Sequence, residues 1–124
     1  MSVQAIGLQH VQLSVEPSDF DRSFDFYTRL VGMPQIHDPF AAPGKGFWVG
    51  AGEQSIHIRV ETGIARDKTR AHPAVIVNDL AACQWGLEAE GFPIFPQPKL
   101  AGFDRFHTND PSGNRLEIMQ RTDD

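Results

Sequence analysis

Three histidines and one glutamate lie in four separate segments that resemble β-strands. Side chains along a β-strand point alternately to its two faces, so each segment is predicted to have one face in a core and one face available for chemistry. Imidazole and carboxylate groups bind borderline divalent metals. The first hypothesis is therefore a metal site on the concave face of a curved sheet, with the candidate ligands His10, His57, His72 and Glu117.

The candidate ligands fall on the polar side of their segments, which are LQHVQLSV, SIHIRVE, HPAVIV and RLEIM. Glu117 is the most informative of them because it lies between Leu116 and Ile118. An unpaired carboxylate near the centre of a sheet is costly, so Glu117 needs a partner. A metal ion would be such a partner, and Arg59 or Arg115 could serve instead.

Composition and charge place the chain among ordinary soluble domains. It has 124 residues, enough for a single domain with its own core, which we take to span residues 1–124. The net charge of −5 argues against nucleic acid as a partner. The basic residues are scattered apart from the cluster RDKTR at 66–70, which we interpret as a solvated loop in preference to a phosphate-binding patch.

One cysteine, Cys83, excludes an intrachain disulfide and fits a reducing compartment. It falls in a predicted helix near Leu80 and Leu87, where it is interpreted as a small buried apolar residue. The start of the sequence lacks the features of a signal peptide, and no apolar run is long enough for a membrane span. We expect a soluble, cytoplasmic protein with no membrane partner.

The chain repeats one order of elements, strand–helix–strand–strand–strand. The first unit covers about residues 7–61, the connector 62–70, and the second unit about 71–121. The candidate ligands repeat with these elements, because His10 and His57 are 47 residues apart and His72 and Glu117 are 45 apart. Internal repetition of this kind is stronger evidence than any single element. We therefore predict an α+β fold of two βαβββ modules, in which helices cover the outer face of curved, cup-shaped mixed sheets.

Five stretches carry a resemblance to a known family: GLQHVQLSV, FYTRLVGM, SIHIRVE, AHPAVIVNDL and DPSGNRLEIMQ. With them the chain resembles the vicinal oxygen chelate superfamily, which includes glyoxalase I, bleomycin-resistance proteins, fosfomycin-modifying enzymes and extradiol dioxygenases. The resemblance runs from about Gly7 to Gln120. It implies the fold, while the substrate stays open because a shared fold does not carry a shared function.

The resemblance also implies metal ligands on the first and last strands of each repeat, which here are His10, His57, His72 and Glu117. Glyoxalase members usually have glutamate at the position of His57. Fosfomycin transferases use a threonine and a tyrosine at the positions that Gln12 and His107 occupy here. The dioxygenases bind iron through two histidines and one carboxylate, a set that three of the four candidates would supply.

Aromatic and polar neighbours of the predicted ligands suggest a pocket for a small molecule. Phe47 and Trp48 are consecutive in a predicted strand, so one of them should face the cup and the other the core. His37 is expected to be exposed, and His107 either lines the cup or hydrogen-bonds a loop. The predicted substrate pocket comprises Gln12, Trp48, Arg59 and His107.

These observations predict a metal-dependent lyase or isomerase of glyoxalase type that acts on a small oxygenated substrate, with Glu117 as the catalytic base. Zinc suits three histidines and a glutamate best, and nickel, cobalt, manganese or iron are alternatives. The competing functions are a metal-free protein that sequesters an antibiotic or metabolite, and a ferrous extradiol-type dioxygenase. The resemblance further implies a homodimer, with His10 and His57 from one chain and His72 and Glu117 from the other.

Overall fold

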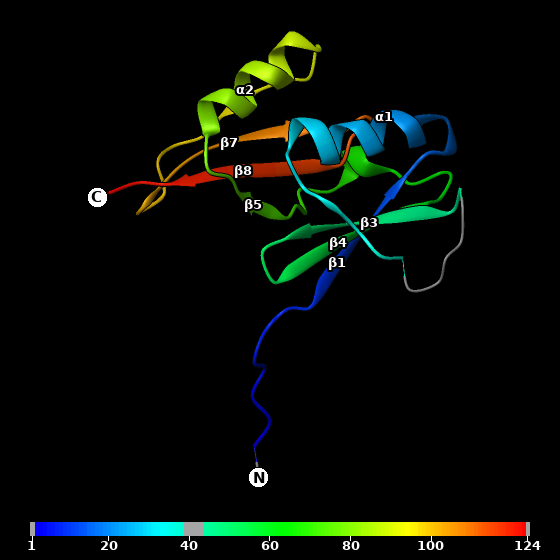
Figure 1. Ribbon diagram of the computed structural model, residues 1–124, viewed down its shortest axis with the longest axis horizontal. Helices are drawn as coiled ribbons and strands as arrows, with labels where there is room; N and C mark the ends of the chain where they lie inside the picture. Colours follow the sequence, from blue (N-terminus) through cyan, green and yellow to red (C-terminus); the bar gives the residue numbers. More distant parts are fainter. Residues whose placement is uncertain (1, 39–43, 124) are drawn as a thin grey trace.

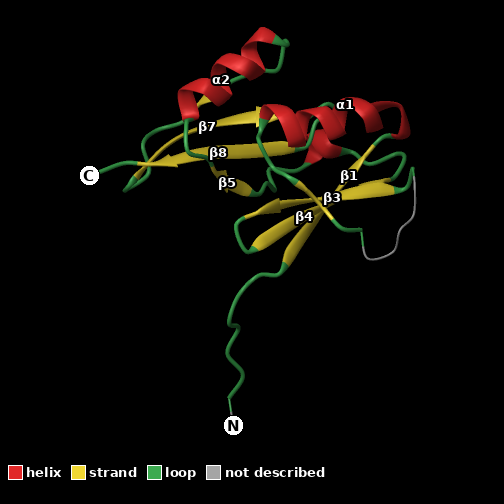
Figure 2. Cartoon of the chain, in the orientation of Figure 1, coloured by secondary structure: helices red, strands yellow, loops and turns green. Residues whose placement is uncertain are grey.

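The protein folds into two four-stranded sheets with a helix in each half, as a computed structural model of residues 2–38 and 44–123 shows. Figures 1 and 2 show both helices on one side of the strands, while the segment before β1 extends away from the body. Within the described residues, no helix combines the length and the apolar character needed to cross a membrane.

The first sheet has the strand order β1-β4-β3-β2. β1 runs parallel to β4, and the other neighbours are antiparallel. The short strand β2 lies in the turn-rich segment that follows the first helix, of which residues 39–43 fall outside the described part. The elements are β1 (His10–Val15), a 3-10 turn (Pro17–Asp19), α1 (Phe20–Asp25) continued by a π-helical turn (Phe26–Leu30), β2 (Gln35–Ile36), β3 (Gly46–Ala51) and β4 (Gln54–Val60).

The second sheet repeats this topology in the order β5-β8-β7-β6, again with a parallel first pair. The repetition confirms the predicted pair of βαβββ modules in an α+β fold. The elements are a 3-10 turn in the connector (Arg66–Lys68), β5 (Ala74–Ile76), α2 (Leu80–Ala89), β6 (Phe95–Pro96), β7 (Phe103–Asn109) and β8 (Arg115–Arg121).

A capping carboxylate and two glycines mark the ends of the helices. The carboxylate of Asp79 accepts a hydrogen bond from the Ala82 amide at 3.0 Å and caps α2. Gly32 and Gly91, which follow the two helices, have φ of 79° and 84°, a conformation that favours glycine. Cys83 is buried in the core as predicted, and burial raises the pKa of its thiol to about 11.

One predicted strand is displaced. The repeated order of elements predicts a strand after the second helix, where the sequence is FPIF at 92–95, but only Phe95 of this segment belongs to β6. Phe92 and Ile94 pack instead against the core. The prolines at 93 and 96 lack an amide donor, which limits regular pairing and explains why β6 is so short.

The alternation along the strands sorts core residues from site residues. Leu116 and Ile118 on β8 are fully buried, as is Ile58 on β4, and all three belong to one hydrophobic cluster shared by the two modules. In β3, Phe47 enters this cluster, where its ring packs edge-on against Phe24. The predicted division between Phe47 and its neighbour Trp48 is thereby confirmed.

A buried hydrogen-bond network joins the first helical segment to the turn between β7 and β8. The Tyr27 hydroxyl donates to Asp110 Oδ2 at 2.7 Å, and the amides of Ser112 and Asn114 donate to Asp110 Oδ1. The Asn114 side chain bridges Asp110 and the carbonyl of Ser14 on β1. Burial raises the pKa of Asp110, and these hydrogen bonds oppose the rise. The network sets the β7–β8 turn, and with it the register of both strands.

Replacing Tyr27 with Phe should lower the free energy of unfolding by about 1–2 kcal/mol, because a buried carboxylate loses a hydrogen-bond donor. Chemical denaturation measures this change. The control is Trp85→Phe, since Trp85 is 76% exposed and its replacement should change stability by less than about 0.5 kcal/mol. Equal stability of Tyr27→Phe and the wild type would show that the network does not anchor the turn.

Candidate functional site

Glu117 is held at the centre of the second sheet by the alternation of β8. Its neighbours Leu116 and Ile118 fill the core, so the carboxylate must point to the opposite face of the sheet. Glu117 is nevertheless only 6% exposed. A charge so poorly solvated requires compensation from nearby groups.

Three side chains provide this compensation. His107, directly opposite Glu117 in the β7–β8 register, places Nε2 at 3.3 Å from Glu117 Oε1. His72, which precedes β5, places Nε2 at 3.1 Å from the same oxygen. Arg105, two residues from His107 on the same strand face, holds Nη1 at 3.3 Å from Glu117 Oε2. Glu117 thus meets two imidazoles at one oxygen and a guanidinium at the other.

The pKa values in this group follow from burial and from these contacts. Burial alone would raise the pKa of Glu117, but the hydrogen bonds from His72 and His107 and the charge of Arg105 outweigh it, so the pKa lies below its ordinary value. Burial lowers the pKa of His107. An ionised carboxylate and a neutral imidazole are the forms that bind metals.

The orientation of His72 creates a mismatch that a cation would resolve. Its Nδ1 lies 2.8 Å from the carbonyl oxygen of Arg70, and a carbonyl only accepts, so Nδ1 carries the proton. A neutral ring then directs the lone pair of Nε2 at the carboxylate of Glu117, which is also an acceptor. Either a proton or a metal ion must lie between these two atoms. A backbone carbonyl that fixes the outer nitrogen is common behind metal-bound histidines.

The donor set fits a divalent metal. One ligand atom each from His72, His107 and Glu117 lies within 4.8 Å of the other two. Metal–ligand distances of about 2.1 Å require donors about 3.4 Å apart in a tetrahedral site, so small side-chain rotations would be enough. Three ligands leave a position open for a water or a substrate oxygen. Among the described residues, this is the one such group of three or more potential ligands.

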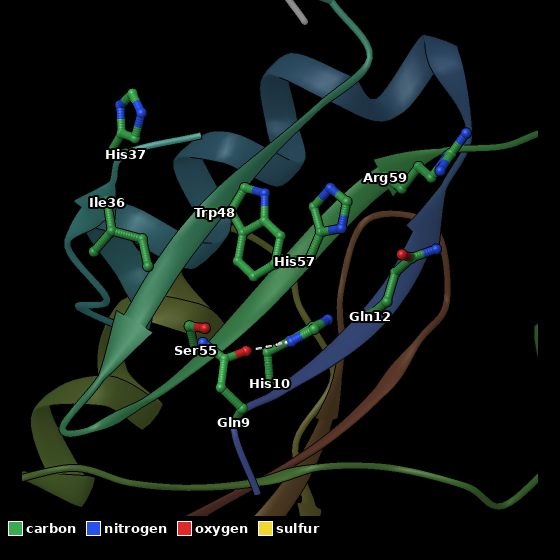
Figure 3. Close-up of a pocket in the computed structure, with 9 residues that line it drawn as sticks. All are labelled: Gln9, His10, Gln12, Ile36, His37, Trp48, Ser55, His57 and Arg59. Atoms are coloured by element: carbon green, nitrogen blue, oxygen red, sulfur yellow. Dashed lines mark hydrogen bonds between the residues drawn. The ribbon is translucent and has the colours of Figure 1, made fainter. Parts of the chain in front are cut away.

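His10 and His57 lie on the other sheet, on β1 and β4. They flank Trp48 of β3, whose ring stacks on His57 at 4.3 Å between centroids and lies 4.8 Å from His10. Figure 3 shows these rings side by side, with Gln12 and Arg59 beside them. The residues line a cavity of about 590 Å³. Burial lowers the pKa of His57.

The four ligands predicted from sequence therefore fall into two places within one chain. His72 and Glu117 are in hydrogen-bond contact, whereas His10 and His57 belong to the cavity beside Trp48. His10 also lines a second cavity, of about 600 Å³ between β1 and β5, together with His72. His37 is exposed at the edge of the first cavity, as expected.

Arg105 is a partner of Glu117 that the sequence did not indicate. The expected alternatives were Arg59 and Arg115, and neither forms an ion pair with Glu117 in the described residues. His107 was assigned to the substrate pocket but lies within hydrogen-bond distance of Glu117. The contact could have been predicted from the turn DPSGN, because a hairpin that is closed by this turn places residue 107 opposite residue 117.

Comparison with known proteins identifies relatives of the whole chain. The model of the Glyoxalase/Bleomycin resistance protein/Dioxygenase superfamily matches residues 7–118. A solved protein of the glyoxalase family from Bacillus anthracis is 30% identical, with 98% of this chain and 100% of that chain covered and a TM-score of 0.80. A search of curated proteins gives no match.

Two further solved structures show the same fold at lower identity. Lactoylglutathione lyase from Agrobacterium tumefaciens is 18% identical, with 92% of this chain and 92% of that chain covered and a TM-score of 0.66. A mutant of the fosfomycin resistance protein FosX from Listeria monocytogenes was solved with manganese and dihydroxypropylphosphonic acid. It is 18% identical, with 96% of this chain and 93% of that chain covered and a TM-score of 0.75.

The lowered pKa of Glu117 predicts a pH dependence of stability in the metal-free protein. A carboxyl with a depressed folded-state pKa stabilises the fold above its unfolded pKa, and this contribution is lost as the pH falls through the folded-state pKa. The unfolding free energy of the wild type should therefore fall more steeply in acid than that of Glu117→Gln.

The Arg105→Gln variant should raise the pKa of Glu117, measured by the carboxyl carbon chemical shift during a pH titration. Arg70→Gln is the matched control, because it removes the same charge from an exposed side chain and keeps the backbone carbonyl that accepts the hydrogen bond of His72. An unchanged Glu117 pKa in Arg105→Gln would contradict the assigned role of Arg105.

Proposed function

We propose that this chain, which belongs to the Glyoxalase/Bleomycin resistance protein/Dioxygenase superfamily, is a metal-dependent enzyme of lyase or isomerase type that acts on a small oxygenated molecule. The observation that carries the proposal is the contact of two imidazoles with one oxygen of a buried, ionised carboxylate. The binding of a divalent metal has a second support, because a protein of the same fold was solved with manganese.

The proposed metal ligands are His72 and Glu117, with His107 beside them in the same chain. Of the four ligands predicted from sequence, His10 and His57 would be supplied by a second copy of the chain. One or both would complete the coordination, and a full set of four protein ligands would leave no position for a substrate oxygen until one ligand, such as Glu117, is released. The donor set of imidazoles and one carboxylate suits zinc best, followed by nickel, cobalt, manganese or iron.

The exposed apolar side chains on the edge strands β1 and β5 support a homodimer. Val11 on β1 and Ile76 on β5 are 37% and 48% exposed, and Leu8 just before β1 is 72% exposed. These apolar side chains line the cavity that His10 and His72 share. Contiguous exposed apolar residues commonly mark an interface, and a second copy of the chain would cover them.

The residues of the site have distinct roles in the proposed reaction. A bound divalent metal would polarise substrate oxygens and lower the pKa of a bound water. Glu117 would leave the metal to accept a proton from the substrate, while Arg105 holds the other oxygen of the carboxylate in place. Trp48 and His57 offer a flat stacked surface, and Gln12 and Arg59 offer donors at its edge. The substrate is thus a small molecule with oxygen functions. The free, buried Cys83 agrees with a cytoplasmic site of action.

A metal-free binding protein is the second candidate, because Arg105 and the two histidines already compensate the charge of Glu117. Such a protein would sequester an antibiotic or metabolite in the cavity beside Trp48. The third candidate, an extradiol-type dioxygenase, is supported by the composition of two histidines and one carboxylate and would require ferrous iron. Metal analysis separates the three.

Untagged protein purified without added metal should contain about one divalent ion per chain, measured by elemental mass spectrometry. Glu117→Gln and His72→Ala should each reduce the content to below about a tenth of that value, since each removes a ligand. His37→Ala, which removes an exposed histidine outside the group, should leave it unchanged. A wild-type protein that neither contains nor takes up metal would support the binding protein instead, and iron would support the dioxygenase.

Mixed dimers test whether two chains share each site. His10→Ala and Glu117→Gln chains, each with too little metal alone, should recover about half of the wild-type content in the mixed dimer. The recovery follows because one of its two sites would combine the intact His10 of one chain with the intact Glu117 of the other. Full metal content in a protein that carries both His10→Ala and His57→Ala would show that the ligands come from one chain. Light scattering supplies the oligomeric state.

A further inference from the structure

A polar cavity of about 450 Å³ lies beside the candidate metal site, between the connector and the turn that joins β7 to β8. Asn109 and Arg115 line it, and they oppose each other in the β7–β8 register. The next pair on the same face is His107 and Glu117, two residues along each strand. The cavity and the metal-binding group are therefore neighbours on one sheet face.

Arg115 presents a guanidinium to this cavity. It shares the strand face of Glu117, and among residues 2–38 and 44–123 its guanidinium has neither a hydrogen bond nor an ion pair. Its charge adds to the effect of burial in lowering the pKa of His107, which places it within electrostatic reach of the site. Guanidinium groups bind oxyanions through paired, charge-assisted hydrogen bonds.

Arg66 brings a second guanidinium to the cavity from the connector. The cluster RDKTR was interpreted as a solvated loop, but the Arg66 side chain is only 7% exposed. Its Nε donates to the Ser14 carbonyl at 2.8 Å, and Nη1 lies 3.4 Å from Glu16 Oε1. The remaining nitrogen, Nη2, is buried and has no hydrogen-bond partner in the described part of the chain. A buried donor without an acceptor is costly, and Arg66 is one of the residues that line the cavity.

The charge of the lining favours an anion. Arg66 and Arg115 carry two positive charges against the single negative charge of Asp67, which is exposed. Asn109 and Thr69 add neutral polar groups around the same space. Glu16, which lies outside the lining, pairs with Arg66, so the positive charge left to attract an anion is that of Arg115.

We propose that this cavity is a binding subsite for the oxyanion group, a carboxylate or phosphate, of a small-molecule ligand. Two residues along a strand span about 6.7 Å, so a short molecule bound here would extend to Glu117 and His107. The identification of that ligand as the substrate rests on the proposed function, whereas binding of the oxyanion itself requires no metal. The subsite thus narrows the substrate to small oxygenated acids.

The test uses the metal-stripped full-length protein, with inorganic phosphate and acetate as separate probes, and measures binding through backbone amide chemical shifts. Phosphate should bind if the natural ligand carries a phosphate, and acetate should bind if it carries a carboxylate. In either case the backbone amide signals of Asn109 and Gly113 should shift. Arg115→Gln should weaken binding about tenfold or more, because a charge-assisted contact is lost. Asn109→Ala, which leaves the charge unchanged, should weaken it about threefold.

Arg70→Gln is the matched control, since it removes one positive charge from an exposed position of the same connector that does not line the cavity. Its affinity should stay within about twofold of the wild type. The proposal is overturned if neither probe binds to the wild type, or if Arg115→Gln and Arg70→Gln weaken binding equally. Arg66 is left intact because its contacts to Ser14 and Glu16 also hold the connector.

Metal content of the same preparations before stripping separates this proposal from the proposed function. Arg115→Gln should retain the metal of the wild type, since Arg115 is not among the proposed ligands. A protein that binds the oxyanion but no metal would contradict the enzyme and uphold the subsite. A protein that binds metal but neither probe would contradict the subsite and uphold the metal centre.

Discussion

The site depends on one constraint, which is the position of the Glu117 carboxylate. Because side chains alternate between the two faces of a strand, this carboxylate lies on the face opposite the core. Leu116 and Ile118 must enter the core, so Glu117 must face away from it, and there it is only 6% exposed. The cost of burying this charge explains why His72, His107 and Arg105 converge on it. A metal-binding group arises from the same placement, because the compensating imidazoles are also metal ligands.

The rest of the fold keeps the two strands that carry this group in register. Asp110 anchors the β7–β8 turn to Tyr27, and Asn114 ties the same turn to Ser14 of the first sheet. Arg66 from the connector binds the same Ser14 carbonyl. One carbonyl thus links the turn of the second module, the connector and the first module. The polar cavity with Arg115 lies at this junction, which gives it fixed walls beside the candidate metal site.

Strand alternation allowed much of the fold and part of the site to be predicted from the sequence. It assigned Glu117 to the site face, divided Phe47 from Trp48, and together with the repeat indicated the two modules. It could not assign Arg105 to Glu117, because that contact depends on the pairing of two strands and not on either strand alone. The burial of Arg66 was missed for a related reason, since its partner at Ser14 is 52 residues away. Whether His10 and His57 join His72 and Glu117 depends on a second chain, which the sequence of one chain does not position.

X-ray absorption spectroscopy of the metal-loaded protein tests the central claim most directly, because it reports the atoms bound to the metal. We predict a first shell of nitrogen and oxygen at about 2.0–2.2 Å with the outer-shell scattering of at least two imidazoles. Glu117→Gln protein, loaded under the same conditions, should lose this spectrum. A shell of water oxygens without imidazole scattering, or an identical spectrum from the Glu117→Gln protein, would contradict a metal centre built on Glu117.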